Sequence, residues 1–309
     1  MDKYQFGFKA KHSTSLCTTN VFKKSVDYYT RKGSHVFTCF VDLSKAFDKV
    51  NYWKLFHKLL VDNIAVPFVY LLAFWYTNQS AFVRWNGVDS GRFSVGNGTR
   101  QGSVLSPYLF TRYIREVITV IAYCAIGCNI AGVFVNILAY ADDIVLLAPS
   151  WKGLQFLIDI FQQATADIDM LCNVDKTVCM VFSPSNRRKI VASSFPEFHL
   201  GDTCLKFVCT FRYLGHIITN DQHDDNDIAR EIRNLFVRTN IPKKNFYKCS
   251  LAVKRVLFRS HCMYFLPRDA SAERGYEIAC RPSVRLSVRD DQVSGTHRLE
   301  FFENNFTAE

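Results

Sequence analysis

The sequence predicts an α+β fold, and three observations support this prediction. Runs of β-branched and aromatic residues alternate with longer runs whose apolar residues recur at helical spacing. Several strand-like runs are joined by short turns, which favours antiparallel pairing. The chain has 309 residues, of which 49% are hydrophobic and 15% aromatic. That content can bury the core of one large domain or two modest ones.

Turn and helix-start signals divide the chain into elements. Pro67 suits the first turn of a helix, because the N–H that proline lacks would have no helical partner there. Asn86-Gly87 is a typical two-residue hairpin turn between two strand-like runs. We expect helices at 13–29, 52–61, 67–76, 106–123 and 154–171, strands at 34–41, 178–182 and 207–218, and a hairpin formed by 81–85 and 92–95.

The charge is positive and concentrated near the C-terminal side. The formal net charge of +10 indicates an anionic partner, either nucleic acid or a membrane surface. Residues 230–268 contain ten Lys or Arg and a single acid, Glu231. A solvated helix face is the ordinary explanation, but the scarcity of acids favours phosphate contact. One face of this helix has the apolar residues expected to dock on a core, namely Ile228, Ile232, Leu235 and Phe236.

The cysteines and apolar runs indicate a cellular compartment. The eleven cysteines lie mostly in hydrophobic surroundings, which fits reduced thiols inside a cell. Cys124 and Cys128 are the closest pair, but no second pair follows at finger-like spacing, which disfavours zinc. No leader-like segment opens the chain, and its apolar runs are shorter than the ~18 residues of a membrane span. We expect an intracellular protein without a membrane span, in the nucleus or the cytoplasm.

Two adjacent carboxylates, Asp142 and Asp143, lie between the apolar runs 137–139 and 144–147. These runs predict two buried strands with the acids at the tip of a hairpin. Like charges at a tight turn repel each other, and burial penalises both, so a divalent cation is expected there. Successive side chains of a strand face opposite ways, so Asp142 and Asp143 cannot both point at one ion unless the turn redirects one of them.

Asp42 ends the apolar strand at 34–41 and is the second acidic element. Alone, it would be interpreted as a cap for the next turn. Together with the acidic hairpin, it predicts that Asp42 and Asp142 hold a pair of Mg²⁺ ions, with Mn²⁺ as a possible substitute, because Mg²⁺ prefers oxygen ligands and is completed by substrate phosphates. Two such ions suit in-line phosphoryl transfer.

Three motifs follow one another along the chain: Phe40-Val41-Asp42-Leu43-Ser44-Lys45-Ala46-Phe47-Asp48, Gly98-Thr99-Arg100-Gln101-Gly102-Ser103-Val104-Leu105-Ser106-Pro107 and Ala139-Tyr140-Ala141-Asp142-Asp143. In this order they resemble the palm of reverse transcriptases from non-LTR, LINE-like retrotransposons. The similarity continues upstream with Gln5-Phe6-Gly7-Phe8 and downstream with Asn173-Val174-Asp175-Lys176-Thr177 and Phe211-Arg212-Tyr213-Leu214-Gly215, and it covers most of residues 5 to about 265.

This resemblance implies a right-hand polymerase. Its parts would be a remnant of the fingers at 1–33, a palm at 34–220 with finger-like segments near 52–100, a basic thumb-like helical region at 221–268 and a poorly defined tail at 269–309. Upstream basic residues that grip the triphosphate in the family do not precede residue 5, so the resemblance implies an N-terminally truncated chain.

The resemblance also implies roles for single residues. Asp42, Asp142 and Asp143 would form the metal site, and Lys176 would be the general acid for pyrophosphate, with a plain surface lysine as the alternative. Leu43, Phe47, Gln101 and Gly102 would contact the incoming nucleotide, with Phe47 excluding a 2′-hydroxyl unless it is only a core residue. Nucleic acid would be contacted by Tyr213, Leu214 and Gly215 of a primer grip and by Arg230, Arg233, Lys243 and Lys244 of the thumb.

The activity implied is RNA-directed DNA polymerisation, with an RNA template, a DNA primer and deoxynucleoside triphosphates as partners. An alternative is a truncated relic that binds nucleic acid without turnover. A metal-dependent nuclease also fits paired acids, but it leaves Phe47 and Gln101-Gly102 unexplained.

Overall fold

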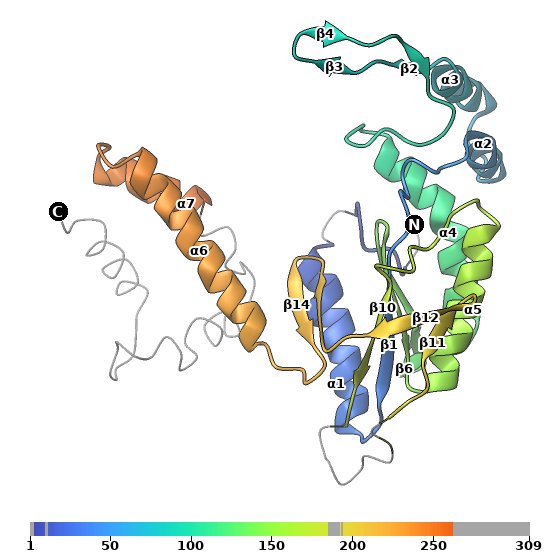
Figure 1. Ribbon diagram of the computed structural model, residues 1–309, viewed down its shortest axis with the longest axis vertical. Coiled ribbons are helices and arrows are strands. Elements are labelled where there is room, and N and C mark those ends of the chain that lie inside the picture. The colour runs from blue at the N-terminus through green and yellow to red at the C-terminus, as the bar shows by residue number, and fades with distance from the viewer. Residues whose placement is uncertain (1–2, 10–11, 185–191, 193, 262–309) are drawn as a thin grey trace. The chain divides into compact units, whose positions relative to one another are not determined.

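The structure is a computed structural model that describes residues 3–9, 12–184, 192 and 194–261 (Figure 1). The chain divides into two compact units, Met1–His223 and Asp224–Glu309. The helices are the π-helical segment η1 (Leu16–Lys23), α1 (Lys24–Arg31), α2 (Tyr52–Val61), α3 (Val66–Thr77), α4 (Ser106–Tyr123), α5 (Trp151–Ala166), α6 (Asp225–Asn245) and α7 (Leu251–His261). The strands are β1 (Val36–Val41), β2 (Ser80–Ala81), β3 (Arg84–Trp85), β4 (Val88–Asp89), β5 (Phe93–Ser94), β6 (Cys128–Ile130), β7 (Val133–Val135), β8 (Ile137–Tyr140), β9 (Asp143–Ala148), β10 (Val178–Phe182), β11 (Phe198–Leu200), β12 (Thr203–Phe207), β13 (Thr210–Tyr213) and β14 (His216–Thr219).

The first unit is built around a six-stranded sheet in the order β11-β12-β10-β1-β9-β8. β1 pairs antiparallel with β9 and β10, so that Cys39 lies opposite Leu146 on one side and Cys179 on the other. The α+β class predicted from sequence is confirmed, but the core is not wholly antiparallel. β12 pairs parallel with β10, because the hairpin with β11 reverses the chain once more before β12 reaches the sheet.

Both faces of β1 are buried, which explains why all of its residues except one threonine are apolar. Phe37, Cys39 and Val41 belong to the core that the sheet shares with α2, α4 and α5, whereas Val36 and Phe40 belong to a second core with η1 and α1. Figure 1 shows α4 and α5 on one side of the sheet and α1 on the other. Packing from both sides holds the end of β1 in place, and this end carries Asp42.

Helix α2 has the bounds predicted from sequence, and α4 begins and ends where expected. The side chain of Asn51 caps α2 by accepting hydrogen bonds from two N–H groups of its first turn. The Tyr113 hydroxyl, fully buried on α4, donates to the Ile168 carbonyl at 2.6 Å and accepts from the Asn51 N–H at 3.3 Å. This one hydroxyl therefore links α4 to Asn51, just before α2, and to Ile168, just after α5.

The prediction for the helix at 154–171 was wrong at its C-terminal end. α5 stops at Ala166, and the chain turns through Asp169, which has a φ of +59°. Ile168 and Met170 are buried in the same core as α5, so they extend its apolar pattern without being helical. The turn brings Leu171 beside Ser44, whose N–H donates to the Leu171 carbonyl at 2.9 Å.

The strand predicted at 207–218 is in fact the end of β12 followed by a separate hairpin of β13 and β14. Leu214 and Gly215 form the hairpin turn with φ values of +47° and +85°. Positive φ at both turn residues matches the right-handed twist of the strands on either side.

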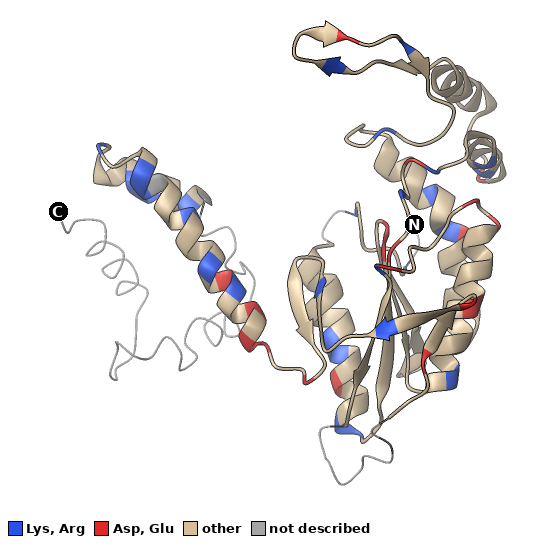
Figure 2. Ribbon diagram, viewed as in Figure 1, with Lys and Arg blue, Asp and Glu red and all other residues tan. Residues whose placement is uncertain are grey.

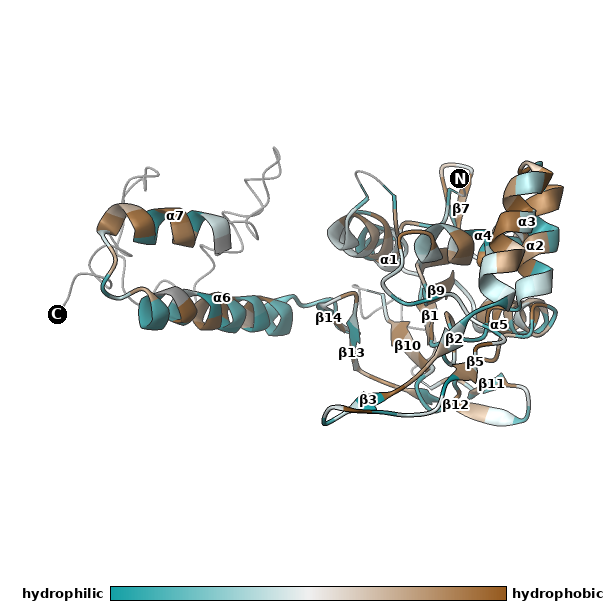
Figure 3. Ribbon diagram, turned by 90° about the horizontal axis from the view of Figure 1, so that it is seen from above, coloured by the Kyte–Doolittle hydropathy of each residue, from teal (hydrophilic) through white to brown (hydrophobic). Residues whose placement is uncertain are grey.

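The hairpin predicted around Asn86-Gly87 is confirmed and consists of two short ladders. β3 pairs with β4 next to the turn, and β2 pairs with β5 further from it. The preceding helix α3 is apolar around most of its circumference (Figure 3). Its Tyr70, Phe74 and Trp75 are exposed.

The second unit contributes helices α6 and α7. The apolar face expected to dock α6 is only partly covered: Ile228 is buried, but 63% of the Phe236 surface is exposed. The spacing of apolar residues predicted the helix correctly but not its packing. Among the described residues, no helix combines the length and apolar character that crossing a membrane requires.

Candidate active site

Asp42 lies directly after β1, and its backbone is held by a segment that is distant in the sequence. Its N–H donates to the buried Thr177 hydroxyl at 3.3 Å, and its carbonyl accepts from the Asn173 N–H at 2.8 Å. Leu43 continues this pairing through a bridge to Cys172. The backbone of the half-buried Asp42 is thus held by hydrogen bonds at both its N–H and its carbonyl.

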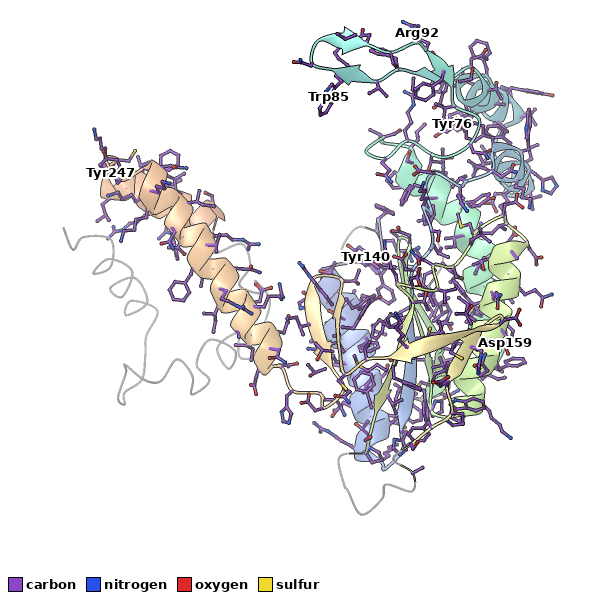
Figure 4. The ribbon with its side chains drawn as sticks, viewed as in Figure 1. Tyr76, Trp85, Arg92, Tyr140, Asp159 and Tyr247 are labelled. Carbon is purple, nitrogen blue, oxygen red and sulfur yellow. The ribbon has the colours of Figure 1, made fainter. Side chains whose placement is uncertain are left out.

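The second carboxylate pair lies in the turn between β8 and β9, which we call the acidic turn (residues 140–143). Tyr140 pairs with Asp143 across the hairpin, so Ala141 and Asp142 are the two turn residues. Ala141 has a φ of +59°, which is rare for a residue with a side chain. Figure 4 labels Tyr140 at this end of the sheet. The predicted hairpin with acids at its tip is confirmed.

The register brings the two acidic elements together. Val41 lies opposite Ile144 in the β1–β9 ladder, so Asp42, one residue later, is at the position across from Asp143. Asp142 is half-buried, whereas Asp143 is exposed at the first position of β9. One end of the sheet therefore carries three carboxylates from two neighbouring strands.

The three carboxylates influence one another electrostatically. Burial, and after it the Asp42 carboxylate, raises the pKa of Asp142. Asp143 is exposed as a residue, but its carboxyl group is partly desolvated by the surrounding chain; this desolvation, then Asp142, then Asp42 raise its pKa to about 6. Each shift reflects a carboxylate that is costly to ionise beside its neighbours, and a cation would remove this cost.

The donor set suits a hard, oxygen-preferring ion such as Mg²⁺. No three His, Cys, Asp or Glu side chains in the described part of the chain are gathered closely enough to enclose a metal. The three acids predicted as ligands thus do not form a ready three-ligand cage. Water and substrate phosphate oxygens would have to complete the coordination, as is usual for Mg²⁺ in phosphoryl-transfer sites.

The loop that carries Gln101 and Gly102 is docked on the segment after Asp42. The Thr99 N–H donates to the Phe47 carbonyl at 2.7 Å, and the Gly98 N–H donates to the Val50 carbonyl at 2.9 Å. Gln101 and Gly102 themselves are exposed beyond these anchors. The sequence motif predicted the loop, but it did not show that backbone bonds attach it to the Asp42 segment.

Phe47 packs against the core on one side and is only partly covered. One face of its ring stacks on the buried Phe110, with centroids 4.4 Å apart and an interplanar angle of 18°. The residue is nevertheless only half-buried. Leu43 differs, since only 5% of its surface is exposed and its side chain belongs to the core, so any nucleotide contact would have to come from its backbone.

Lys176 is exposed on the segment that anchors Asp42. The Thr177 N–H closes a turn by donating to the Asn173 carbonyl at 2.9 Å, and both of these residues contact the Asp42 backbone. Sequence reasoning included Thr177 in a motif but gave it no role. A small hydroxyl residue next to a candidate catalytic lysine is the signal that could have drawn attention to it.

The primer-grip residues divide into two kinds. Tyr213 is 3% exposed, and its hydroxyl lies 3.7 Å from the Cys17 sulfur in the second core. The expected contact of its side chain with nucleic acid therefore does not fit this structure. Strand alternation is the reason, because Tyr213 and Phe211 face inward while Arg212 is exposed between them. Gly215 is exposed and Leu214 half-buried at the turn.

The basic residues of the second unit also differ among themselves (Figure 2). Arg230 is paired with Asp227 at 2.8 Å and Glu231 at 2.6 Å, and 15% of its side chain is exposed. Its cation is thus largely engaged within α6, contrary to the expectation that it is presented to phosphate. Arg233, Lys243 and Lys244 are exposed and keep that expectation.

Comparison with known proteins bears directly on this site. The family model described as reverse transcriptase (RNA-dependent DNA polymerase) matches residues 1–218, which include both acidic elements and the docked loop. The chain belongs to the reverse transcriptase family. The match covers most of the first unit, and the family that the sequence motifs implied is confirmed.

The relatives of this reverse transcriptase are proteins from mobile elements. It is 26% identical over 187 residues to a Pol polyprotein of the type-2 retrotransposable element R2DM of Drosophila melanogaster, covering 59% of this chain and 18% of the relative. It is 26% identical over 224 residues to the RNA-directed DNA polymerase of the mobile element jockey of Drosophila funebris. This match covers 70% of this chain and 23% of the relative. It thus spans about a fifth of the length of these relatives.

Two solved structures share a weaker similarity with this reverse transcriptase. Telomerase from Candida tropicalis, in complex with a fragment of telomeric RNA, is 12% identical with a TM-score of 0.46 and covers 93% of this chain and 45% of its own. The Candida albicans telomerase is 14% identical with a TM-score of 0.39, covering 96% and 47%.

Proposed function

We propose that this chain is the polymerase part of a non-LTR retrotransposon protein. It would add deoxynucleotides to the 3′-hydroxyl of a DNA primer, directed by an RNA template, and release pyrophosphate. The observation that carries the proposal is the placement of Asp42 across from the acidic turn within a chain of the reverse transcriptase family. Three carboxylates at one end of a sheet suit phosphoryl transfer assisted by divalent ions.

Asp42 and Asp142 would hold the two Mg²⁺ ions, with Asp143 as the weaker ligand. When bound, such ions would neutralise charge on the attacking and leaving oxygens. The contribution of the chain itself is to hold the carboxylates in place before substrate arrives. The backbone bonds from Asn173 and Thr177 support this role for Asp42, since they fix the residue without using its carboxylate.

The nucleotide would bind beside Phe47, Gln101 and Gly102. The Phe110 stack holds the ring of Phe47 from behind, so its open face is rigid enough to exclude a 2′-hydroxyl. The backbone of Leu43 and the exposed Gln101-Gly102 pair would complete the contacts. Lys176 would donate the proton to pyrophosphate, because it is exposed on the segment that anchors Asp42.

The nucleic acid would be held by the hairpin turn at Leu214 and Gly215 and by the exposed cations of α6. Arg233, Lys243 and Lys244 would contact phosphates, which suits recognition of an RNA·DNA duplex by its shape. Arg230 would instead stabilise α6 through its pairs with Asp227 and Glu231.

Primer extension on an RNA template in Mg²⁺ or Mn²⁺ tests the proposal. Asp142→Asn keeps the shape of the side chain but removes its charge, so incorporation should fall by at least about 100-fold. Asp159→Asn is the matched control, because Asp159 is an exposed acid on α5 that accepts a hydrogen bond from Gln155, and it should leave incorporation unchanged (Figure 4).

Two results would overturn the proposal in different directions. Wild-type protein that is folded, binds template-primer and incorporates nothing would support the binding-only relic, especially if Asp42→Asn leaves salt-sensitive binding intact. Cleavage of a labelled primer without nucleotides, lost in Asp142→Asn, would support a nuclease.

A further inference from the structure

The acidic turn is held by a side chain from the other end of the sequence. Gln5 lies 136 positions before Ala141, yet its side-chain amide bonds to both backbone groups of that residue. The Ala141 N–H donates to Gln5 Oε1 at 2.9 Å, and Gln5 Nε2 donates to the Ala141 carbonyl at 3.2 Å. We propose that Gln5 is a positioning residue that fixes the acidic turn and thereby aims Asp142 and Asp143.

The amide of Gln5 acts toward Ala141 as a neighbouring strand would. Ala141 is a turn residue with a left-handed backbone, so the β8–β9 ladder does not bond its two peptide groups. Gln5 is 3% exposed, and its Oε1 also accepts from the Gly7 N–H at 2.9 Å. The buried amide of Gln5 thus makes three hydrogen bonds of fixed direction, and these restrict the backbone of the turn to a single conformation.

Main-chain bonds on both sides of Gln5 fix where its side chain starts. β8 is the outermost strand of the sheet, and the segment around Gln5 pairs with it in parallel. The Ala139 N–H donates to the Tyr4 carbonyl at 3.0 Å, and the Phe6 N–H donates to the Ala139 carbonyl at 2.7 Å. Gln5 is therefore attached to the same strand that leads into the turn it holds.

The approach of this segment to the turn leaves no spare room. A Cβ atom added to Gly7 would lie 2.4 Å from the Ala141 nitrogen and 3.1 Å from the Tyr140 carbonyl carbon. The backbone of the segment thus lies directly against the turn. Tilting of the turn toward this side is blocked, and Gln5 restrains it from moving away.

The arrangement of Gln5 and Ala141 also determines where the Asp142 side chain points. Asp142 is joined to Ala141 by one peptide bond, so the direction of the Ala141 carbonyl sets the direction from which the Asp142 side chain projects. Repulsion among the carboxylates of Asp42, Asp142 and Asp143, which the register brings to one end of the sheet, acts to spread the turn open. Gln5 opposes that spreading without touching a carboxylate, and this role in metal binding rests on the proposed function.

The experiment compares wild type with Gln5→Met, which keeps the length of the side chain but has no amide. Hydrogen exchange should accelerate by about tenfold at the Ala141 amide, the factor expected for loss of one ordinary hydrogen bond, while the amides of Val145 and Leu146 in β9 keep their rates. The dissociation constant for Mn²⁺, followed by electron paramagnetic resonance, should rise by about 10-fold or more.

Asn136→Leu is the matched control. Asn136 is a fully buried amide just before β8 that donates to the Ile121 and Ile126 carbonyls at 2.7 and 2.9 Å, and leucine keeps the number and branching of its side-chain heavy atoms. Thermal unfolding identifies a temperature at which all variants are folded. There, Asn136→Leu should leave Ala141 exchange and Mn²⁺ affinity at wild-type values.

Wild-type exchange at Ala141 in Gln5→Met, or an equal change in the Asn136→Leu control, would overturn the role of Gln5. Failure of the proposed function has a different signature: wild-type protein then binds no Mn²⁺ or extends no primer. In that case the exchange comparison still decides whether Gln5 holds the turn.

Discussion

Three glycines of the loop between β5 and α4 allow the docking of that loop to be tested one atom at a time. A Cβ added to Gly98 would lie 2.7 Å from the Asp48 carbonyl oxygen and 2.8 Å from the Asp48 Cα, and Gly98 has a φ of +92°. Gly102 has a φ of +81° with nothing within 4 Å, and Gly96 has neither constraint. Substitution by alanine therefore adds steric overlap and backbone strain at Gly98, backbone strain alone at Gly102, and neither at Gly96.

The expected costs follow in that order. Gly102→Ala should lower the free energy of unfolding by about 1–2 kcal/mol, the cost of a left-handed backbone with a side chain. Gly98→Ala should lower it by about 2–5 kcal/mol, because an overlap of about 1–3 kcal/mol is added and the contacted atoms are backbone, which cannot swing away. Gly96→Ala should be neutral or stabilise by about 0.4–1 kcal/mol through the unfolded chain.

Urea unfolding of the three variants measures these differences directly. Gly98→Ala should also raise the KM for deoxynucleotides, because the displaced loop carries Gln101 and is bonded to the Phe47 carbonyl. Equal destabilisation by Gly98→Ala and Gly102→Ala would refute the reasoning, since it would mean that the loop does not rest on Asp48.

Three further predictions concern the gate, the acids and the cations. Phe47→Val should lower the preference for deoxynucleotides over ribonucleotides, measured as a ratio of kcat/KM values; a loss of stability with an unchanged ratio would make Phe47 a core residue only. Because the pKa of Asp143 is raised from 3.8 to about 6, its contribution to stability is present below about pH 4 and lost as pH rises through 6. Asp143→Asn should therefore stabilise the metal-free protein by on the order of 1 kcal/mol at pH 8, after a discount for its exposed side chain, and by nothing at pH 4; thermal melts at both values with equal gains would contradict this. Replacing Lys243 and Lys244 together by glutamine should reduce the slope of log affinity against log salt by about 2 in filter-binding titrations, and an unchanged slope would remove them from the interface.

The parts of the fold that were predictable from sequence are those where burial is uniform. β1 is covered on both faces, so all of its residues except Thr38 are apolar and its end at Asp42 is marked by the change to a carboxylate. The acidic turn is bounded in the same way by β8 and β9. Where a core continues past a helix end, the same logic misleads. Ile168 and Met170 are buried beyond the end of α5, and their pattern therefore predicted five further helical residues, 167–171, that are not helical.

Positions within a motif were predictable, but the environment of each side chain was not. A family motif identifies Tyr213, and the run of cations from 230 to 268 identifies Arg230. Neither the burial of Tyr213 in the second core nor the ion pairs of Arg230 can be inferred from those patterns alone. Alternation along β13, with exposed Arg212 between two aromatic residues, would have predicted an inward Tyr213. Gln5 had no such signal, because a polar residue close to the start of a chain is ordinarily exposed.

The anchors of the two acidic elements explain why local strand propensity is not enough to build this site. Neither Asp42 nor Ala141 obtains its decisive hydrogen bonds from its own hairpin: Asp42 is held by Asn173 and Thr177, and Ala141 by Gln5. Three mutually repelling carboxylates would otherwise relax apart at strand ends, where the ladder is weakest. Because these hydrogen bonds come from distant segments, the positions of the carboxylates depend on the stability of the whole first unit. Substitutions in the apolar core should therefore reduce activity only through the folded fraction, whereas substitutions at the anchors should change metal affinity in protein that remains folded.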